Sequence, residues 1–135
     1  MPAPLEWLKG IGEICCEFDI PLIVDEIQCG LGRTGEVFSF ANAGIVPDAI
    51  VLSKAVGGGL LMSLLIYKSQ CDVWKPGAHT GTFRGNQMAM VSGIETLNRI
   101  TDMQFLNDVK RKGQLFVELY HRLIIQLLEI FAAEV

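Results

Sequence analysis

The sequence lacks the features of a membrane, secreted or nucleic-acid-binding protein. Its 135 residues include 11 basic and 15 acidic side chains, for a net charge of −4, so it has no basic excess to meet a phosphate backbone. The longest uncharged apolar stretch, residues 55–67, contains three glycines and is shorter than the ~20 residues of a membrane span. No basic and apolar leader opens the chain. We therefore predict a cytoplasmic protein with neither nucleic-acid nor membrane partners.

Cysteine is also scarce and poorly placed for cross-linking. The four cysteines include no C-x-x-C pair, and two of them, Cys15 and Cys16, are adjacent, which would strain a bridge between them. They indicate reduced thiols, and we predict no metal centre. Since half of the residues are apolar, the chain can bury a core of one domain.

Two short apolar runs predict neighbouring parallel strands. Residues 5–18 carry apolar side chains at helical spacing, and strands are expected at 22–24 and 49–52 with a short helix at 37–43 between them. Parallel neighbours end at the same edge of a sheet. Asp25 and Lys54, each just past a strand, would therefore face one crevice.

The second half predicts a turn back and two helices. The three glycines at 57–59 are too short a connector for a crossover helix, so a third strand at 60–67 should run antiparallel. Helical spacing returns at 87–100. A capping box at 101–104 should begin another helix that runs to about residue 133. The apolar end of that helix has nothing after it to cover it, so the chain is expected to be cut at both ends from a larger protein.

The glycine-rich stretch at 30–35 has two interpretations. Its sequence, GLGRTG, matches the dinucleotide-binding pattern G-x-G-x-x-G after a strand. However, Asp25 and Glu26 directly before it would repel a pyrophosphate, and no long helix follows. A dinucleotide-binding module and a plain surface turn remain as alternatives.

The lysine and the carboxylate predicted at one edge suit pyridoxal phosphate chemistry. Lys54 lies 29 residues after Asp25, and the glycines at 57–59 would leave room for a bulky ligand near its amine. A desolvated lysine forms a Schiff base with an aldehyde, and a carboxylate can keep a pyridine nitrogen protonated. An ordinary ion pair is the alternative.

Three ordered segments, 23–35, 53–59 and 81–87, resemble the class III pyridoxal-phosphate aminotransferases. The amino-acid sequence of residues 77–90 is most similar to that of family members that use diaminobutyrate and 2-oxoglutarate. The resemblance extends from residue 5 to about 113, a minority of a full-length member. It implies an α/β fold that is the central part of the large domain of a fold-type I pyridoxal-phosphate-dependent transferase. Residues 1–100 would be a partial cofactor-binding large domain, and 101–135 a long helix leading toward an absent small C-terminal domain.

The resemblance also implies roles for individual residues. Lys54 would bind pyridoxal 5'-phosphate covalently and move the substrate proton, Asp25 would pair with the ring nitrogen, and Gln28 would approach the ring hydroxyl. Thr82 would bond the phosphate of a cofactor in a neighbouring subunit, so a homodimer or higher homo-oligomer is expected.

The implied reaction moves the terminal amino group of L-2,4-diaminobutyrate to 2-oxoglutarate, giving aspartate 4-semialdehyde and glutamate. The substrates are thus a small amino acid and a 2-oxo acid. Two alternatives remain: another terminal-amine transaminase, acting on ornithine, acetylornithine or 4-aminobutyrate, and a non-catalytic truncated fragment.

Overall fold

The computed structural model describes residues 3–79, 81 and 84–133. The elements follow one another as α1 (Leu5–Glu17), β1 (Ile23–Asp25), η1 (Ala41–Ala43), β2 (Ala49–Leu52), β3 (Leu64–Tyr67), η2 (Ser69–Cys71), α2 (Gln87–Ile100) and α3 (Met103–Ala133). None of the helices in these ranges combines the length and apolar character needed to cross a membrane.

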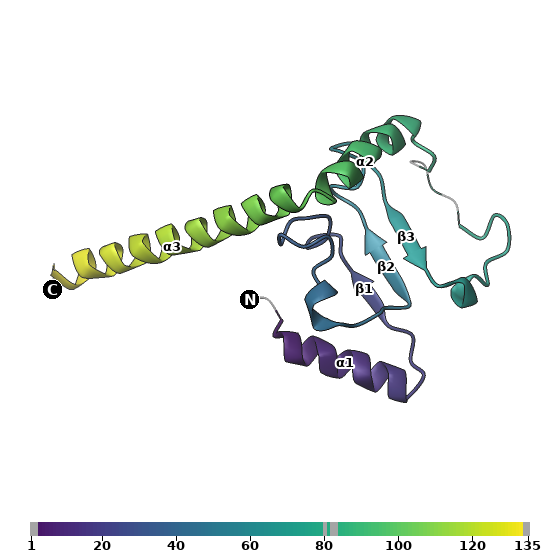
Figure 1. Ribbon diagram of the computed structural model, residues 1–135, viewed down its shortest axis with the longest axis horizontal. Helices are drawn as coiled ribbons and strands as arrows, with labels where there is room; N and C mark the ends of the chain where they lie inside the picture. Colours follow the sequence, from purple (N-terminus) through teal and green to yellow (C-terminus); the bar gives the residue numbers. More distant parts are fainter. Residues whose placement is uncertain (1–2, 80, 82–83, 134–135) are drawn as a thin grey trace.

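The three strands form one mixed sheet in the order β1-β2-β3. β1 and β2 run parallel, with Ile23 opposite Ala49 and Asp25 opposite Val51. β3 pairs antiparallel with β2, with Tyr67 opposite Ala49. Both predicted pairings are confirmed. The parallel register brings the carboxyl ends of β1 and β2 to one edge, toward α2, and α1 lies at the opposite edge (Figure 1).

The connection between β1 and β2 differs from the expected short helix. Only the 3-10 helix η1 forms, in place of a helix over 37–43. The carbonyl of Val37 accepts a hydrogen bond from the Leu31 amide at 2.8 Å, and the rings of Phe38 and Phe40 stack at 5.5 Å. These contacts close a loop on itself, so residues 37–40 are not free to continue a helix.

A small core covers one face of the sheet. Its buried members come from the loop after β1, from β2, from the turn after β2 and from the end of α2: Leu31, Leu52, Val56 and Ile100. On the other face, Ile23, Leu65 and Tyr67 remain 37–63% exposed. The core therefore fixes the loop and the turn that follow β1 and β2.

The two long helices confirm their predicted ranges, but the cap between them is shifted. Asp102 caps α3, with Oδ1 accepting hydrogen bonds from the amides of Gln104 (2.8 Å) and Phe105 (3.4 Å). The expected capping residue Thr101 instead donates its hydroxyl to the carbonyl of Asn98, so the capping-box prediction is wrong. α3 then runs away from the sheet (Figure 1).

Candidate active site

The edge where β1 and β2 end carries the residues singled out from the sequence. Asp25 is the last residue of β1 and lies opposite Val51, three residues before Lys54. The Glu26 amide adds one more bond to this ladder, donating to the carbonyl of Val51 at 2.9 Å. The side chains of Asp25 and Lys54 are both exposed. The parallel register is therefore the reason that these two chemical groups reach the same edge.

Lys54 occupies a strained turn directly after β2. Its φ is 45°, in the left-handed region that residues other than glycine seldom adopt, and such strain gathers at functional sites. The preceding Ser53 anchors the turn: its Oγ donates to the carbonyl of Met62 at 2.9 Å and lies 3.0 Å from Ser63 Oγ. The turn is thus tied to the segment leading into β3, while the lysine amine is presented to solvent.

The amine of Lys54 meets the amide side chain of Gln28, with Nζ donating to Oε1. Asp25 uses its Oδ1 to accept from the Ile27 amide at 2.8 Å, which fixes the start of the turn on which Gln28 stands. The partner of Lys54 in the structure is therefore Gln28 rather than Asp25. Three of the four predicted site residues are placed along one edge, and the carboxylate and the amine are not consumed in a mutual ion pair.

Thr82, the fourth predicted site residue, lies outside the described residues. The segment just after it is described from residue 84, where Asn86 caps α2 by accepting from the Ala89 amide at 3.3 Å. The contact predicted between Thr82 and the cofactor of a neighbouring subunit stays a prediction.

The glycines of residues 30–35 serve packing. A Cβ on Gly30 would lie 2.7 Å from Oε2 of Glu26, and one on Gly32 would lie 3.0 Å from the Ile100 side chain. A Cβ on Gly35 would overlap the Lys110 side chain of α3. The loop thus lies against the carboxylate and the helices, which removes the basis for a dinucleotide site made of bare backbone amides.

The glycines after Lys54 likewise differ from expectation. A Cβ on Gly57 would collide with the carbonyl of Leu60, and one on Gly58 would collide with Ser92 of α2, whereas Gly59 faces open space. The prediction that all three leave room for a ligand is wrong for the first two. Gly57 lets the turn close tightly on the following segment, and Gly58 lets it pack closely against α2.

A buried carboxylate next to Asp25 escaped the sequence analysis. Glu26 is 1% exposed, and its carboxylate accepts hydrogen bonds from Ser39: Oε2 from the amide at 3.0 Å and Oε1 from the hydroxyl. Sequence alone pairs Glu26 with Asp25 as two carboxylates that would repel a pyrophosphate, whereas only Asp25 is exposed. The strand alternation places successive side chains on opposite faces, which is the signal that separates the two.

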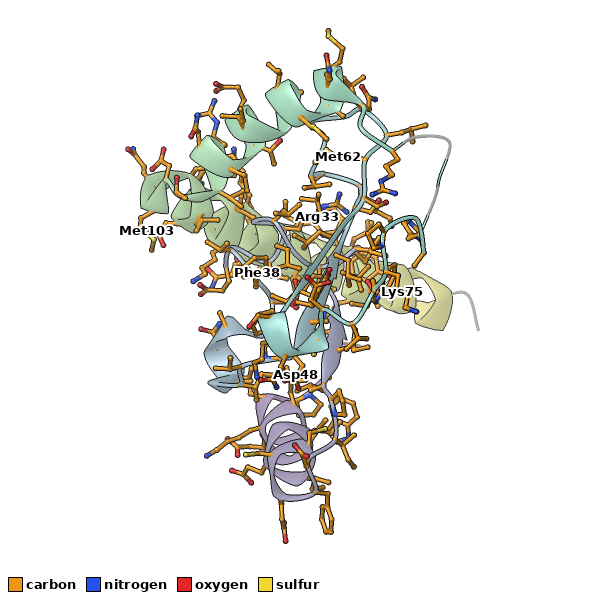
Figure 2. The ribbon with its side chains drawn as sticks, turned by 90° about the vertical axis from the view of Figure 1, so that its right-hand side faces the viewer. Arg33, Phe38, Asp48, Met62, Lys75 and Met103 are labelled. Carbon is orange, nitrogen blue, oxygen red and sulfur yellow. The ribbon has the colours of Figure 1, made fainter. Side chains whose placement is uncertain are left out.

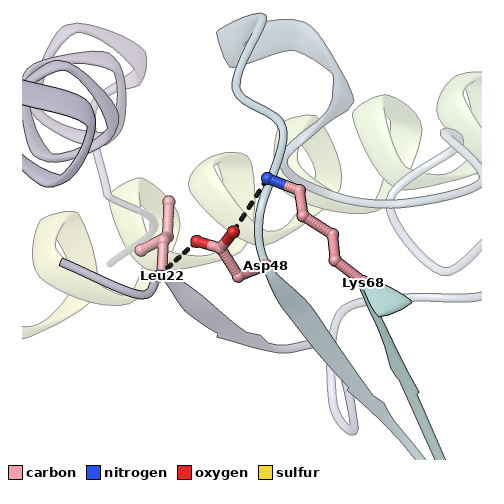
Figure 3. A network of polar contacts seen from close by, with 3 residues as sticks. All are labelled: Leu22, Asp48 and Lys68. Atoms are coloured by element: carbon pink, nitrogen blue, oxygen red, sulfur yellow. Dashed lines mark hydrogen bonds and ion pairs between the residues drawn. The ribbon is translucent and has the colours of Figure 1, made fainter. Parts of the chain in front are cut away.

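A recess of about 880 Å³ lies at the other edge of the sheet, between α1 and the segments leading into β1 and β2. Asp48, labelled in Figure 2, lines it. Its Oδ1 accepts from Lys68 Nζ and its Oδ2 from the Leu22 amide, both at 2.8 Å (Figure 3). The hydrogen bond from Lys68 is the largest cause that holds the pKa of Asp48 below its ordinary value, and the hydrogen bond from the Leu22 amide is the next largest. Since the charges of Asp48 and Lys68 in this recess neutralise each other, the recess is the weaker candidate for a reactive site.

One further ion pair fixes the loop after β1. Glu36 accepts from Lys110 Nζ at 2.5 Å, and this hydrogen bond holds the pKa of Glu36 below its ordinary value. The loop is thereby joined to α3.

The model of the family described as Aminotransferase class-III matches residues 1–126. The chain belongs to this family. It is 56% identical over 100 residues to the diaminobutyrate–2-oxoglutarate aminotransferase of Rhizobium meliloti (strain 1021), an alignment covering 74% of this chain and 21% of that protein. It is 46% identical over 131 residues to the diaminobutyrate–2-oxoglutarate transaminase of Oceanobacillus iheyensis, covering 96% of this chain and 31% of that protein.

Among solved structures, the ornithine aminotransferase of Toxoplasma gondii superimposes with a TM-score of 0.80 at 34% sequence identity. The match covers 90% of this chain and 29% of that chain. The likeness confirms the predicted fold class, an α/β part of a larger aminotransferase fold. The chain spans 21% and 31% of the length of the two curated relatives described above.

Proposed function

We propose that the chain is the cofactor-lysine part of a pyridoxal-phosphate-dependent aminotransferase that moves the terminal amino group of L-2,4-diaminobutyrate to 2-oxoglutarate. The observation that carries the chemistry is the meeting of Lys54 and Gln28 beside Asp25 at the carboxyl edge of β1 and β2. The choice of substrate rests on the two relatives named for that reaction, at 56% and 46% identity.

The residues at this edge fit pyridoxal phosphate by the chemistry of their side chains. An amine, a carboxylate and a neutral amide stand on turns whose backbones the core holds. When bound, the cofactor supplies an aldehyde for the amine and a ring that withdraws electrons from a substrate carbon. The lysine is a primary amine on an exposed, strained turn, and the carboxylate lies on the strand next to it.

Each residue then has a distinct part in the reaction. Lys54 would hold the cofactor through its amine, and the same amine would act as the base that moves a proton at the reacting substrate carbon. Asp25 would keep the ring nitrogen of the bound cofactor protonated through charge attraction. Gln28 accepts a hydrogen bond from the Lys54 amine through its Oε1 and would help to hold the cofactor at its ring hydroxyl.

Several finer assignments belong to the same proposal. Thr82 of one subunit would bond the cofactor phosphate of another, which makes the enzyme a homodimer or a larger homo-oligomer. Residues 1–100 would form part of the cofactor-binding domain and 101–135 a helix toward a small domain. The protein would work in the cytoplasm, as its free cysteines suit a reducing compartment.

A second candidate is a transaminase for another terminal amine. The superposition on an ornithine aminotransferase at a TM-score of 0.80 favours this reading. A third, a non-catalytic piece, is favoured by the exposed apolar side chains on the sheet face and along α3, such as Leu65, Phe116 and Leu123.

A donor panel separates these candidates. The chain is incubated with pyridoxal phosphate, 2-oxoglutarate and one amine at a time: L-2,4-diaminobutyrate, ornithine, N-acetylornithine or 4-aminobutyrate. Glutamate formation is measured. We expect diaminobutyrate to give the fastest rate. A faster rate with another donor would reassign the substrate, and no glutamate from any donor would support the non-catalytic piece.

A further inference from the structure

Glu26 is the one charged side chain that is buried among the residues that the structure describes. Its two hydrogen-bond donors both belong to Ser39, through the backbone amide and the hydroxyl. Both donors are neutral, although a buried carboxylate is stabilised best by a cation. An apolar residue would cost less at such a position if packing were its only purpose. We therefore look for the role of the Glu26 carboxylate in the residues that it connects.

The residues connected are the two ends of the loop after β1. Glu26 follows the last residue of β1, and Ser39 lies 13 residues later, just before η1. Halfway along, the Leu31 amide donates to the carbonyl of Val37 at 2.8 Å. We call the two hydrogen bonds between Glu26 and Ser39 the Glu26–Ser39 clamp.

The clamp encloses the turn that carries Gln28. The Gly30 amide donates to the carbonyl of Glu26 at 3.0 Å, so Gln28 lies within a tight turn based on Glu26. A Cβ on Gly30 would approach the Glu26 carboxylate to 2.7 Å. The carboxylate thus lies under the same turn that presents Gln28 to Lys54. Asp25 is the residue immediately before it.

We propose that Glu26 is a positioning residue: by clamping Ser39 it fixes the Asp25–Gly30 turn so that Asp25 and Gln28 face the cofactor beside Lys54. The clamp acts through Asp25 and Gln28, because the Glu26 carboxylate is buried and accepts its hydrogen bonds from Ser39 rather than from the Lys54 amine. This inference rests on the proposed function, since it assigns the clamp to the same site.

The test compares two carboxylates on the same loop. Ser39→Ala removes the hydroxyl donor of the clamp and keeps the amide, and Glu26→Gln changes the acceptor itself. Glu36→Gln is the matched control, because Glu36 holds the loop to Lys110 of α3 and does not touch the turn. Amide hydrogen exchange at Gly30 is measured on each full chain. Borohydride trapping of pyridoxal phosphate on Lys54 is measured on the same samples.

We expect Ser39→Ala to speed exchange at Gly30 by about tenfold, the scale of one net hydrogen bond, with exchange in α2 unchanged and slower trapping at Lys54. Glu36→Gln should leave Gly30 exchange unchanged. If Glu26→Gln does not fold, Ser39→Ala still decides the matter.

Two results would count against the proposal in different ways. Unchanged Gly30 exchange in Ser39→Ala, or an equal rise in α2, overturns the positioning role while wild-type trapping leaves the proposed function intact. Absence of trapping in the wild-type chain overturns the proposed function and, with it, the role of the clamp toward the cofactor.

Discussion

The two edges of the sheet each carry a carboxylate and a lysine, yet the two pairs are built differently. At the edge near α1, Asp48 receives Lys68 and the Leu22 amide, both at 2.8 Å (Figure 3). At the edge near α2, Asp25 and Lys54 each bond elsewhere, to the Ile27 amide and to Gln28.

The difference leads us to propose that the first pair is structural and the second is chemical. Asp48 and Lys68 satisfy each other and join the start of β2 to the end of β3, which is a common role for an ion pair. Lys54 stands on a left-handed backbone and is held by a neutral amide, which leaves its amine and the Asp25 carboxylate available to a ligand. A lysine near a carboxylate is thus informative only when the two are not bonded together.

The largest effect is expected from removing the lysine at the second edge. Lys54→Ala should remove most of the covalently attached pyridoxal phosphate, because Lys54 is the lysine whose amine Gln28 holds at this edge. Intact mass after borohydride reduction measures the attachment. Lys68→Ala is the control and should keep it. Equal attachment in Lys54→Ala and the wild-type chain would erase the distinction between the two edges.

Removing the carboxylate should slow the reaction without preventing attachment. Asp25→Asn is expected to keep the Lys54 adduct and to lower the rate of glutamate formation by about 100-fold or more, the scale of one positioned proton-handling group. The matched substitution Asp48→Asn should leave that rate within a small factor of wild type. Near-normal turnover in Asp25→Asn would show that another group serves the ring nitrogen.

The amide partner of Lys54 should have a smaller effect. Gln28→Ala removes one hydrogen bond to the amine, so the rate of trapping at Lys54 should fall by about three- to tenfold. Gln70→Ala, at the recess beside Asp48, changes the same side chain at the other edge and should leave trapping unaltered. Equal trapping rates in both variants would deny Gln28 its role.

The smallest effect concerns stability and its dependence on pH. The pKa of Asp48 is lowered in the folded chain, chiefly by Lys68, so its contribution is present above the unfolded value and is lost as pH falls through the folded value. Asp48→Asn should therefore lower the urea midpoint at neutral pH. The difference from wild type should shrink in acid below the ordinary aspartate value of 3.8. If the difference in urea midpoint between Asp48→Asn and wild type stayed constant as the pH fell, the charge of Asp48 would not be the cause of the stabilisation.

Much of the fold could be predicted because its signals are local. The α2 helix and β2 match their predicted ranges, since helical spacing defines the one and a short apolar run after Asp48 defines the other. The antiparallel β3 followed from the short glycine connector, although the strand begins at Leu64 rather than at residue 60.

The remaining features depend on contacts between residues far apart. The helix expected over 37–43 shrinks to η1 because Val37 is bonded back to Leu31. Nothing in the local pattern reveals that Glu26 is bonded to Ser39, or that Lys54 adopts a positive φ. The strand pattern predicts that Asp25 and Lys54 lie at one edge, but it does not identify Gln28 as the hydrogen-bond partner of the Lys54 amine.

The most direct measurement compares the two edges in one sample. The wild-type chain is mixed with pyridoxal phosphate and reduced with borohydride, and the added mass on Lys54 and Lys68 is quantified by peptide mapping. We predict that Lys54 carries most of the label, because its amine is held by a neutral amide while Lys68 is bound to Asp48. Equal labelling of the two lysines, or preference for Lys68, would contradict it.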